Sequence, residues 1–204
     1  MSEPLSESIQ HYLREIFKLR QDEGKATVTA LSLHSYPLVQ DRYVLLPHGA
    51  SMGSGYGPVV VWPEPLTRAE LREVEIAVPG RMTTAFLVLR MYLGEWWLLE
   101  TGLPLPLGIN VARRDLGEEV LHDLSEVLRE SIRAGLDNRE EAMQYAMQFG
   151  RGLDERLADR FVGMYVNELT EDYGDEGRKA VQELLRRAEA IGFYGRPVTL
   201  SFIS

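Results

Sequence analysis

The 204-residue sequence contains no cysteine, which excludes disulfides, thiolate nucleophiles and cysteine-based metal sites. This absence suits a cytoplasmic protein, and we expect the chain to be cytoplasmic. Long apolar runs are also missing, because the longest one, AFLVLRMYL, contains Arg90 and is far too short to span a bilayer. The first twenty residues are charged throughout and lack the apolar core of a signal peptide.

An excess of basic residues is missing as well. The formal net charge is −9, and phosphate backbones and anionic lipids attract Lys and Arg rather than Asp and Glu. We therefore expect no nucleic-acid partner and no membrane partner. The apolar share of 45% is enough for a substantial core in one large domain or two small lobes.

Segments rich in β-forming residues come first along the chain, and helical periodicity dominates later. An amphipathic helix is predicted over 6–22, and four further helices are predicted between residue 115 and Gly192. Asp115–Glu118 and Asn138–Glu141 fit helix-capping boxes. Strands are predicted over 26–33, 41–46, 57–62 and 73–78, and an extended segment over 102–116. This order indicates an α/β chain.

The stretch PHGASMGSGYGPVVV, residues 47–61, resembles a phosphate-binding loop in composition but not in context. A Walker A loop needs a lysine and then a helix, and a dinucleotide fingerprint needs a strand before the glycines and a helix after them. Here no lysine follows, and the loop leads into VVV. We predict a flexible loop that enters a buried strand.

A better anion site lies in VPGRMTTAF, residues 78–86, where a predicted strand turns into a predicted helix. The first amides of a helix lack intrahelical partners and carry partial positive charge, and the hydroxyls of Thr83 and Thr84 add donors. The alternative is that one threonine simply caps the helix. Ser32, at the end of the strand containing TALS, is a weaker second candidate.

The four histidines give no metal-binding spacing, and we predict no metal site. His11 and His122 lie in charged helical segments and are expected to be solvated. His34 and His48 lie near turns. Either could approach a cleft, but a histidine in a turn is more often polar surface than a catalytic base.

Four strings, read together, resemble the 1,4-dihydroxy-6-naphthoate synthase family of the futalosine route to menaquinone. They are TALSLHSYPLVQDRYVLLPHGASMGSGYGPVVV, EIAVPGRMTTAF, LGEWWLLETGLPLPLGINVARRDLGEE and MYVNELTEDYGDEGRKAVQELL. The resemblance covers about residues 28–204. It implies an α/β, periplasmic-binding-protein-like (type II) fold of two lobes around a cleft. It also implies a lyase that cleaves cyclic de-hypoxanthine futalosine without a metal or nucleotide cofactor.

The resemblance implies that the carboxylate-bearing small-molecule substrate is bound at the strand end and at the helix start. The matching positions are Ala30, Leu31, Ser32, Thr83, Thr84 and Ala85. This agrees with the anion site argued from the helix start.

Two departures from the family pattern stand out. Residues 1–27 resemble instead the first helix of a diphtheria-toxin-repressor-type regulator, without a recognition helix to follow, so we expect no DNA-binding role. Some tens of family residues are missing between MYL and GEWW, including the segment that holds the family's proposed base histidine.

The second departure has consequences for structure and for activity. We expect a truncated second lobe with residues 75–108 as its remnant, and exposed edges that favour self-association as a homodimer. No catalytic residue is assigned. The alternative function is a catalytically impaired carboxylate-binding module or remnant of the enzyme.

Overall fold

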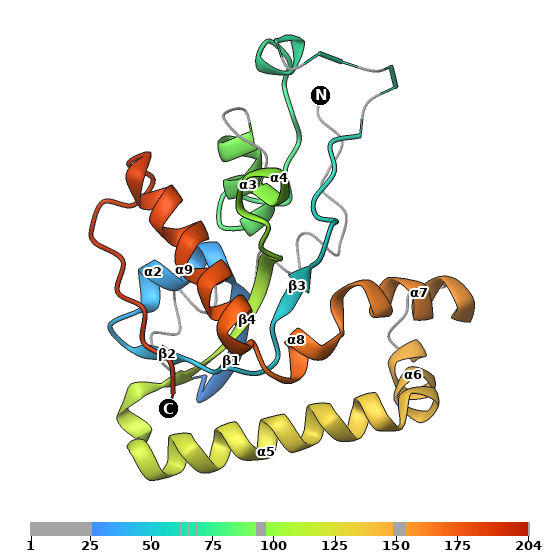
Figure 1. Ribbon diagram of the computed structural model, residues 1–204, viewed down its shortest axis with the longest axis vertical. Helices are drawn as coiled ribbons and strands as arrows, with labels where there is room; N and C mark the ends of the chain where they lie inside the picture. Colours follow the sequence, from blue (N-terminus) through green and yellow to red (C-terminus); the bar gives the residue numbers. More distant parts are fainter. Residues whose placement is uncertain are drawn as a thin grey trace.

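The computed structural model describes residues 26–61, 63–64, 66–67, 69–92, 97–148 and 154–203. The helix expected over 6–22 lies outside the described residues. The fold is mixed α/β, as predicted, with a small sheet covered by helices on both faces (Figure 1).

The sheet is built around one long strand, β4 (Leu105–Arg113). On one side β1 (Val28–Ser32) pairs with it antiparallel, with Val28 opposite Ala112 and Ser32 opposite Gly108. On the other side β2 (Tyr43–Leu45) and β3 (Ser51–Gly53) pair with β4 one after the other, both antiparallel. The predictions of strands within 26–33, 41–46 and 102–116 are thus confirmed.

Alternate residues of these strands enter two separate apolar clusters, because successive side chains of a strand point to opposite faces. Leu45, Ile109 and Val111 face the main cluster, which includes Leu184 of α9 (Gly174–Ala190). Val44, Leu46 and Ala112 face the second cluster, together with Leu121 of α5 (Glu118–Asp137). Figure 1 accordingly shows α9 and α5 on different sides of the sheet.

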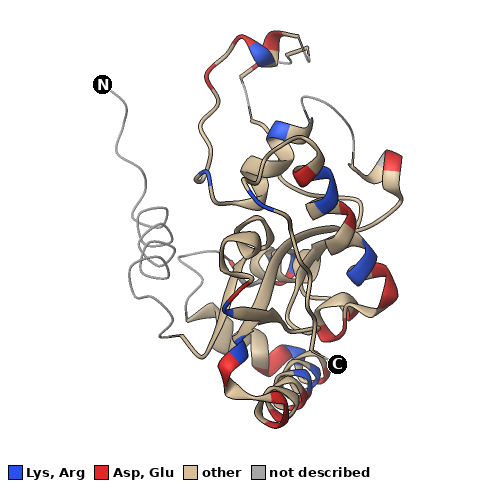
Figure 2. Ribbon diagram, turned by 90° about the vertical axis from the view of Figure 1, so that its left-hand side faces the viewer, with Lys and Arg blue, Asp and Glu red and all other residues tan. Residues whose placement is uncertain are grey.

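The remaining helical elements are short and connect or flank the sheet. They are η1 (Leu33–Ser35), α2 (Tyr36–Val39), η2 (Glu70–Arg72), α3 (Thr84–Tyr92), α4 (Trp97–Thr101), η3 (Arg114–Leu116), α6 (Arg139–Met147), α7 (Glu155–Tyr165) and α8 (Glu168–Glu171). No helix among the described residues is long and apolar enough to cross a membrane. Charged residues lie mainly on the helices, and both signs are mixed there (Figure 2).

Both predicted capping boxes are wrong, although the helices exist. Asp115 forms an ion pair with Arg113 instead, and Gly117 occupies the N-cap of α5. The Asn138 side-chain amide donates to the Ala134 carbonyl, so it closes the end of α5 rather than opening α6. The predicted stop at Gly192 is confirmed by its positive φ of 72° after α9.

The strands predicted over 57–62 and 73–78 are wrong, since the described residues there form neither helix nor strand. They belong to an extended arm, the described residues within 54–79, which leaves the body in Figure 1. Val59 and Val61 are 81% and 84% exposed. A β-prone segment forms a strand only where another strand accepts its backbone hydrogen bonds, and the arm has no such partner among the described residues.

The glycine-rich loop is anchored by its backbone. The Gly49 amide donates to the Thr170 carbonyl at 2.7 Å, and the Tyr173 amide donates to the Pro47 carbonyl at 3.0 Å. His48 donates from Nδ1 to the Glu171 carbonyl at 2.6 Å. The loop therefore docks onto α8, and the buried strand that it enters is β3, not the predicted VVV segment.

Replacing Gly49 by alanine tests this anchoring. Its φ is +79°, and an added Cβ would lie 2.0 Å from Nδ2 of Asn110. We expect G49A to lose roughly 1–3 kcal/mol of unfolding free energy in urea, from strain and overlap. Gly135 in α5 has open space around it, and we expect G135A to gain about 0.5–1 kcal/mol. Equal stability of the two variants would contradict the anchored-loop description.

Candidate functional site

The end of β1 meets the start of α3 through two hydroxyl side chains 52 residues apart in sequence. Ser32 Oγ lies 2.9 Å from Thr84 Oγ1, and the Thr84 amide donates to Ser32 Oγ at 2.7 Å. Both residues are buried. The structure therefore brings together the two segments that were predicted to form one site.

The directions of these hydrogen bonds follow from chemistry. A carbonyl only accepts, so Thr84 Oγ1 donates to the Leu107 carbonyl of β4 at 2.7 Å. The Ser32 hydroxyl then donates to Thr84 Oγ1, which also accepts from the His34 amide at 3.3 Å. The Thr84 hydroxyl is fully used, and it joins β1, α3 and β4. We call this arrangement of Ser32, Thr84 and the Leu107 carbonyl the hydroxyl clasp.

Thr83 has a different role, which is that of helix cap. Its Oγ1 accepts from the Phe86 amide at 3.2 Å and donates to the Gly80 carbonyl at 2.8 Å. The alternative reading, in which one threonine caps the helix, is therefore correct for Thr83.

The first amides of α3 differ in their hydrogen-bond partners. The Thr84 amide is bonded to Ser32 and the Phe86 amide to Thr83, whereas the Ala85 amide has no hydrogen-bond partner among the described residues. Ala85 is half-buried. An amide in this position carries partial positive charge and suits a carboxylate oxygen.

The other two predicted positions lie on β1 just before Ser32. Ala30 is exposed and Leu31 is half-buried, and they pair with Asn110 and Ile109 of β4. All six predicted site residues therefore come from the end of β1 or the start of α3.

His34 was expected at the polar surface, and this expectation is wrong. The side chain is 4% exposed, and its ring meets Phe193 edge-on at 4.8 Å between centroids. Nε2 lies 3.1 Å from the Arg81 carbonyl and Nδ1 lies 2.9 Å from the Tyr194 hydroxyl. Burial lowers the pKa of His34 below its ordinary value of 6.5.

Sequence reasoning missed this histidine because a single residue after a strand gives no periodic signal. The one available hint was its position two residues after Ser32. Tyr194 is 160 residues away, and no local pattern connects the two. Ser35 was missed for the same reason, although its hydroxyl donates to the Met82 carbonyl at 2.8 Å.

The other described histidines lie elsewhere. His48 is buried in the glycine-rich loop, so the expectation of a surface residue is wrong there too. His122 is exposed on α5, as predicted, and His11 lies outside the described residues. Within the described part of the chain, no three His, Asp or Glu side chains gather to hold a metal ion.

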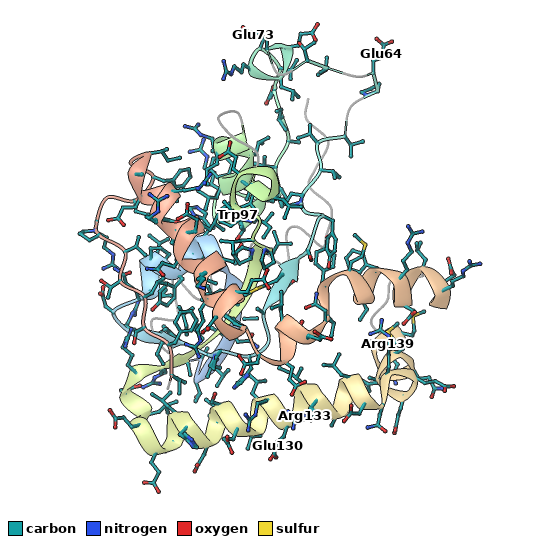
Figure 3. The ribbon with its side chains drawn as sticks, in the orientation of Figure 1. Glu64, Glu73, Trp97, Glu130, Arg133 and Arg139 are labelled. Carbon is teal, nitrogen blue, oxygen red and sulfur yellow. The ribbon has the colours of Figure 1, made fainter. Side chains whose placement is uncertain are left out.

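A surface hollow of about 350 Å³ lies between α4 and α9, away from the hydroxyl clasp. Its lining residues are Glu100, Thr101, Leu103, Lys179, Gln182, Glu183, Arg186 and Arg187. Hydrogen bonds from Arg186 and Arg187 lower the pKa of Glu183 to about 2. Arg187 also pairs with Glu100 and lies over the Trp97 ring, which Figure 3 labels. The charges of this hollow largely satisfy one another.

Comparison with known families identifies one family that matches most of the chain. The family described as "Menaquinone biosynthesis" matches residues 8–95 and 92–190 of this chain. The two matches overlap only at residues 92–95. This break coincides with the position between MYL and GEWW where family residues were expected to be missing.

Individual relatives agree with the family match. A protein of Thermus thermophilus named 1,4-dihydroxy-6-naphthoate synthase is 35% identical over 83% of this chain and 79% of its own length. A Streptomyces coelicolor protein of the same name is 31% identical over 84% of this chain and 78% of its own length. A crystal structure of an Archaeoglobus fulgidus protein has a TM-score of 0.74 at 33% identity, covering 91% of this chain and 85% of that one.

The alignments are longer than the residues that this chain contributes to them. The alignment with the Thermus protein spans 216 positions, although it includes only 83% of a chain of 204 residues. Tens of aligned positions therefore have no counterpart here. This agrees with the internal deletion inferred from the sequence.

The hydroxyl clasp predicts how the fold responds to changes at Thr84. Thr84→Val keeps the side-chain shape but removes the shorter of the two hydrogen bonds to the Leu107 carbonyl and the acceptor of the His34 amide. We expect a loss of about 1–3 kcal/mol of unfolding free energy. Thr84→Ser retains the hydroxyl and should lose clearly less. Urea unfolding measures both, and a valine variant as stable as the unaltered chain would contradict the clasp.

The buried His34 predicts a pH dependence of stability. Because the pKa of His34 is lowered in the folded state, the unfolded chain takes up a proton more readily below its ordinary pKa of 6.5. The stability that the neutral, buried His34 contributes is therefore fully present above pH 6.5, and it is lost as the pH falls towards the pKa of His34 in the folded state. Urea unfolding between pH 7.5 and 5 should show a steeper loss for the unaltered chain than for His34→Gln. His122→Gln is the control, and equal slopes for all three would exclude this role of His34.

Proposed function

This chain belongs to the menaquinone biosynthesis family that includes the 1,4-dihydroxy-6-naphthoate synthases, and from that premise we propose its function. The chain is a carbon–carbon lyase by descent, which releases 1,4-dihydroxy-6-naphthoate from cyclic de-hypoxanthine futalosine. The observation that supports this most directly is the meeting of Ser32 with Thr84 at the start of α3.

The substrate site in this proposal consists of Ala30, Leu31, Ser32, Thr83, Thr84 and Ala85. The Ala85 amide and the Ser32 hydroxyl, after rotation away from Thr84, bind a substrate carboxylate. Thr83 and Thr84 hold these donors in place through the helix cap and the hydroxyl clasp. Ala30 and Leu31 form the adjoining wall.

The proposed architecture is a periplasmic-binding-protein-like fold of two lobes, spanning residues 28–204, with residues 75–108 as the remnant of the second lobe. Two observations support a truncated lobe. The relatives have tens of residues that this chain lacks, and Val59, Val60 and Val61 of the arm are exposed. Figure 3 places Glu64 and Glu73 on the arm, well away from Trp97 in the body. An extended segment with exposed valines is what we expect of a strand whose partner strands are missing.

A second candidate function is a carboxylate-binding module with impaired catalysis. The described histidines favour it, because none of them offers a free base at the site. Both ring nitrogens of His34 are bonded, His48 is held by the Glu171 carbonyl, and His122 lies on α5. Proton abstraction without a positioned base loses about 10²–10⁴-fold in rate.

The proposed setting follows from the family and from composition. The protein acts in the cytoplasm on a small carboxylate, without metal or cofactor, and without nucleic-acid or membrane partners. We also propose that the chain self-associates as a homodimer. Leu157 and Phe161 of α7 are 50% and 56% exposed, and the arm adds its valines.

Turnover and binding separate the two functions. The purified chain is incubated with cyclic de-hypoxanthine futalosine while naphthoate release is followed, and calorimetry measures affinity for 1,4-dihydroxy-6-naphthoate. Turnover supports the lyase, and binding without turnover supports the module. The absence of both contradicts the proposed function.

A substitution locates the binding to this site. Ser32→Ala should weaken naphthoate binding about tenfold, because one hydrogen bond to a charged group is lost. Thr29→Ala on the same strand is the control and should bind like the unaltered chain. Equal affinity of the Ser32 variant would remove Ser32 from the site.

A further inference from the structure

The turn that leads into α3 is held from outside by η1. The Arg81 carbonyl lies 3.1 Å from Nε2 of His34, and the Met82 carbonyl accepts from the Ser35 hydroxyl at 2.8 Å. These two contacts fix consecutive peptide groups immediately before Thr83. The orientation of the first α3 amides therefore depends on η1.

The tautomer of His34 follows from its two partners. A carbonyl cannot donate, so Nε2 carries the proton and donates to Arg81. Nδ1 is then an acceptor, and the Tyr194 hydroxyl donates to it at 2.9 Å. Of Arg81, His34 and Tyr194, Tyr194 alone lies in the segment that follows α9, which we call the C-terminal segment.

The C-terminal segment is itself fixed to the same corner of the fold. Arg196 donates to the Pro37 carbonyl, and the Thr199 amide donates to Gln40 Oε1 at 2.8 Å. Gln40 Nε2 donates in return to the Pro197 carbonyl at 2.9 Å. Tyr194 is therefore held in place beside η1, and His34 connects this fixed segment to the turn before α3.

We propose that His34 is a positioning residue for substrate binding: through Nε2 it holds the Arg81 carbonyl, and so it aims the Ala85 amide at the substrate carboxylate, while the Tyr194 hydroxyl holds the ring in place through Nδ1. This inference rests on the proposed function, because the carboxylate is that of the proposed ligand. His34 itself does not touch the substrate, since both of its ring nitrogens are occupied.

The test compares three variants by calorimetry with 1,4-dihydroxy-6-naphthoate, each well below its melting temperature. His34→Phe keeps a ring against Phe193 but removes both nitrogens, and we expect about tenfold weaker binding. His34→Gln places an amide donor near the position of Nε2, and binding should recover to within roughly threefold of the unaltered chain. The affinity of Tyr194→Phe for 1,4-dihydroxy-6-naphthoate should fall between those of the two His34 variants.

A purely structural role gives a different pattern. His34→Phe would then lower the melting temperature and leave the affinity unchanged, which would overturn the inference. Failure of the unaltered chain both to turn over the futalosine substrate and to bind naphthoate would instead overturn the proposed function, and the substrate part of the inference with it.

Hydrogen exchange tests the positioning step without any ligand. Peptides covering residues 79–86 should exchange faster in His34→Phe than in His34→Gln. Peptides from α5, on the other side of the sheet, should not differ between the two. Equal exchange over 79–86 would show that His34 does not hold the turn.

Discussion

The hydroxyl clasp is the interaction on which the rest of the site depends. Thr84 Oγ1 donates to the Leu107 carbonyl and accepts from Ser32 and from the His34 amide, so one buried side chain joins three elements. A buried polar network of this kind is stable only when each member is satisfied, and here the Thr84 hydroxyl has no capacity left. The clasp thereby fixes where α3 begins, and the beginning of α3 decides which amide remains available. The hydroxyls of Thr83 and Thr84 are thus taken up by structural hydrogen bonds, whereas the Ala85 amide has no partner among the described residues.

Much of the fold was predictable from local patterns. Val28–Ser32 and Leu105–Arg113 form strands, and Glu118–Asp137 forms a helix. In each, the apolar residues recur with the period of the element, and the folded chain provides a neighbour against which they are buried. The site was predictable to the extent that a strand end and a helix start each carry their own signal. The pairing of Ser32 with Thr84 was beyond periodicity, and it came instead from family resemblance. The contact between His34 and Tyr194 was not predictable, because the two residues are 160 positions apart and only the folded chain brings them together.

The failed predictions have a common physical cause. Segments 57–62 and 73–78 have the composition of strands, but strand formation is a property of pairs, and the described part of the chain supplies them with no partner. The relatives contain tens of residues that are missing here. A local propensity without its tertiary partner therefore yields an exposed arm. The capping prediction at Asp115 failed for a related reason, since this carboxylate forms an ion pair with Arg113 instead of capping a helix.

The central claim is that the Ala85 amide, held by the clasp and the Arg81 turn, binds a carboxylate. A titration of 15N-labelled protein with 1,4-dihydroxy-6-naphthoate, followed by NMR, tests it most directly. We expect the amide proton of Ala85 to move downfield in a saturable manner, with smaller changes at Ser32 and little change in α5. An unmoved Ala85 amide together with saturable shifts around Lys179 and Arg186, in the hollow between α4 and α9, would contradict the account.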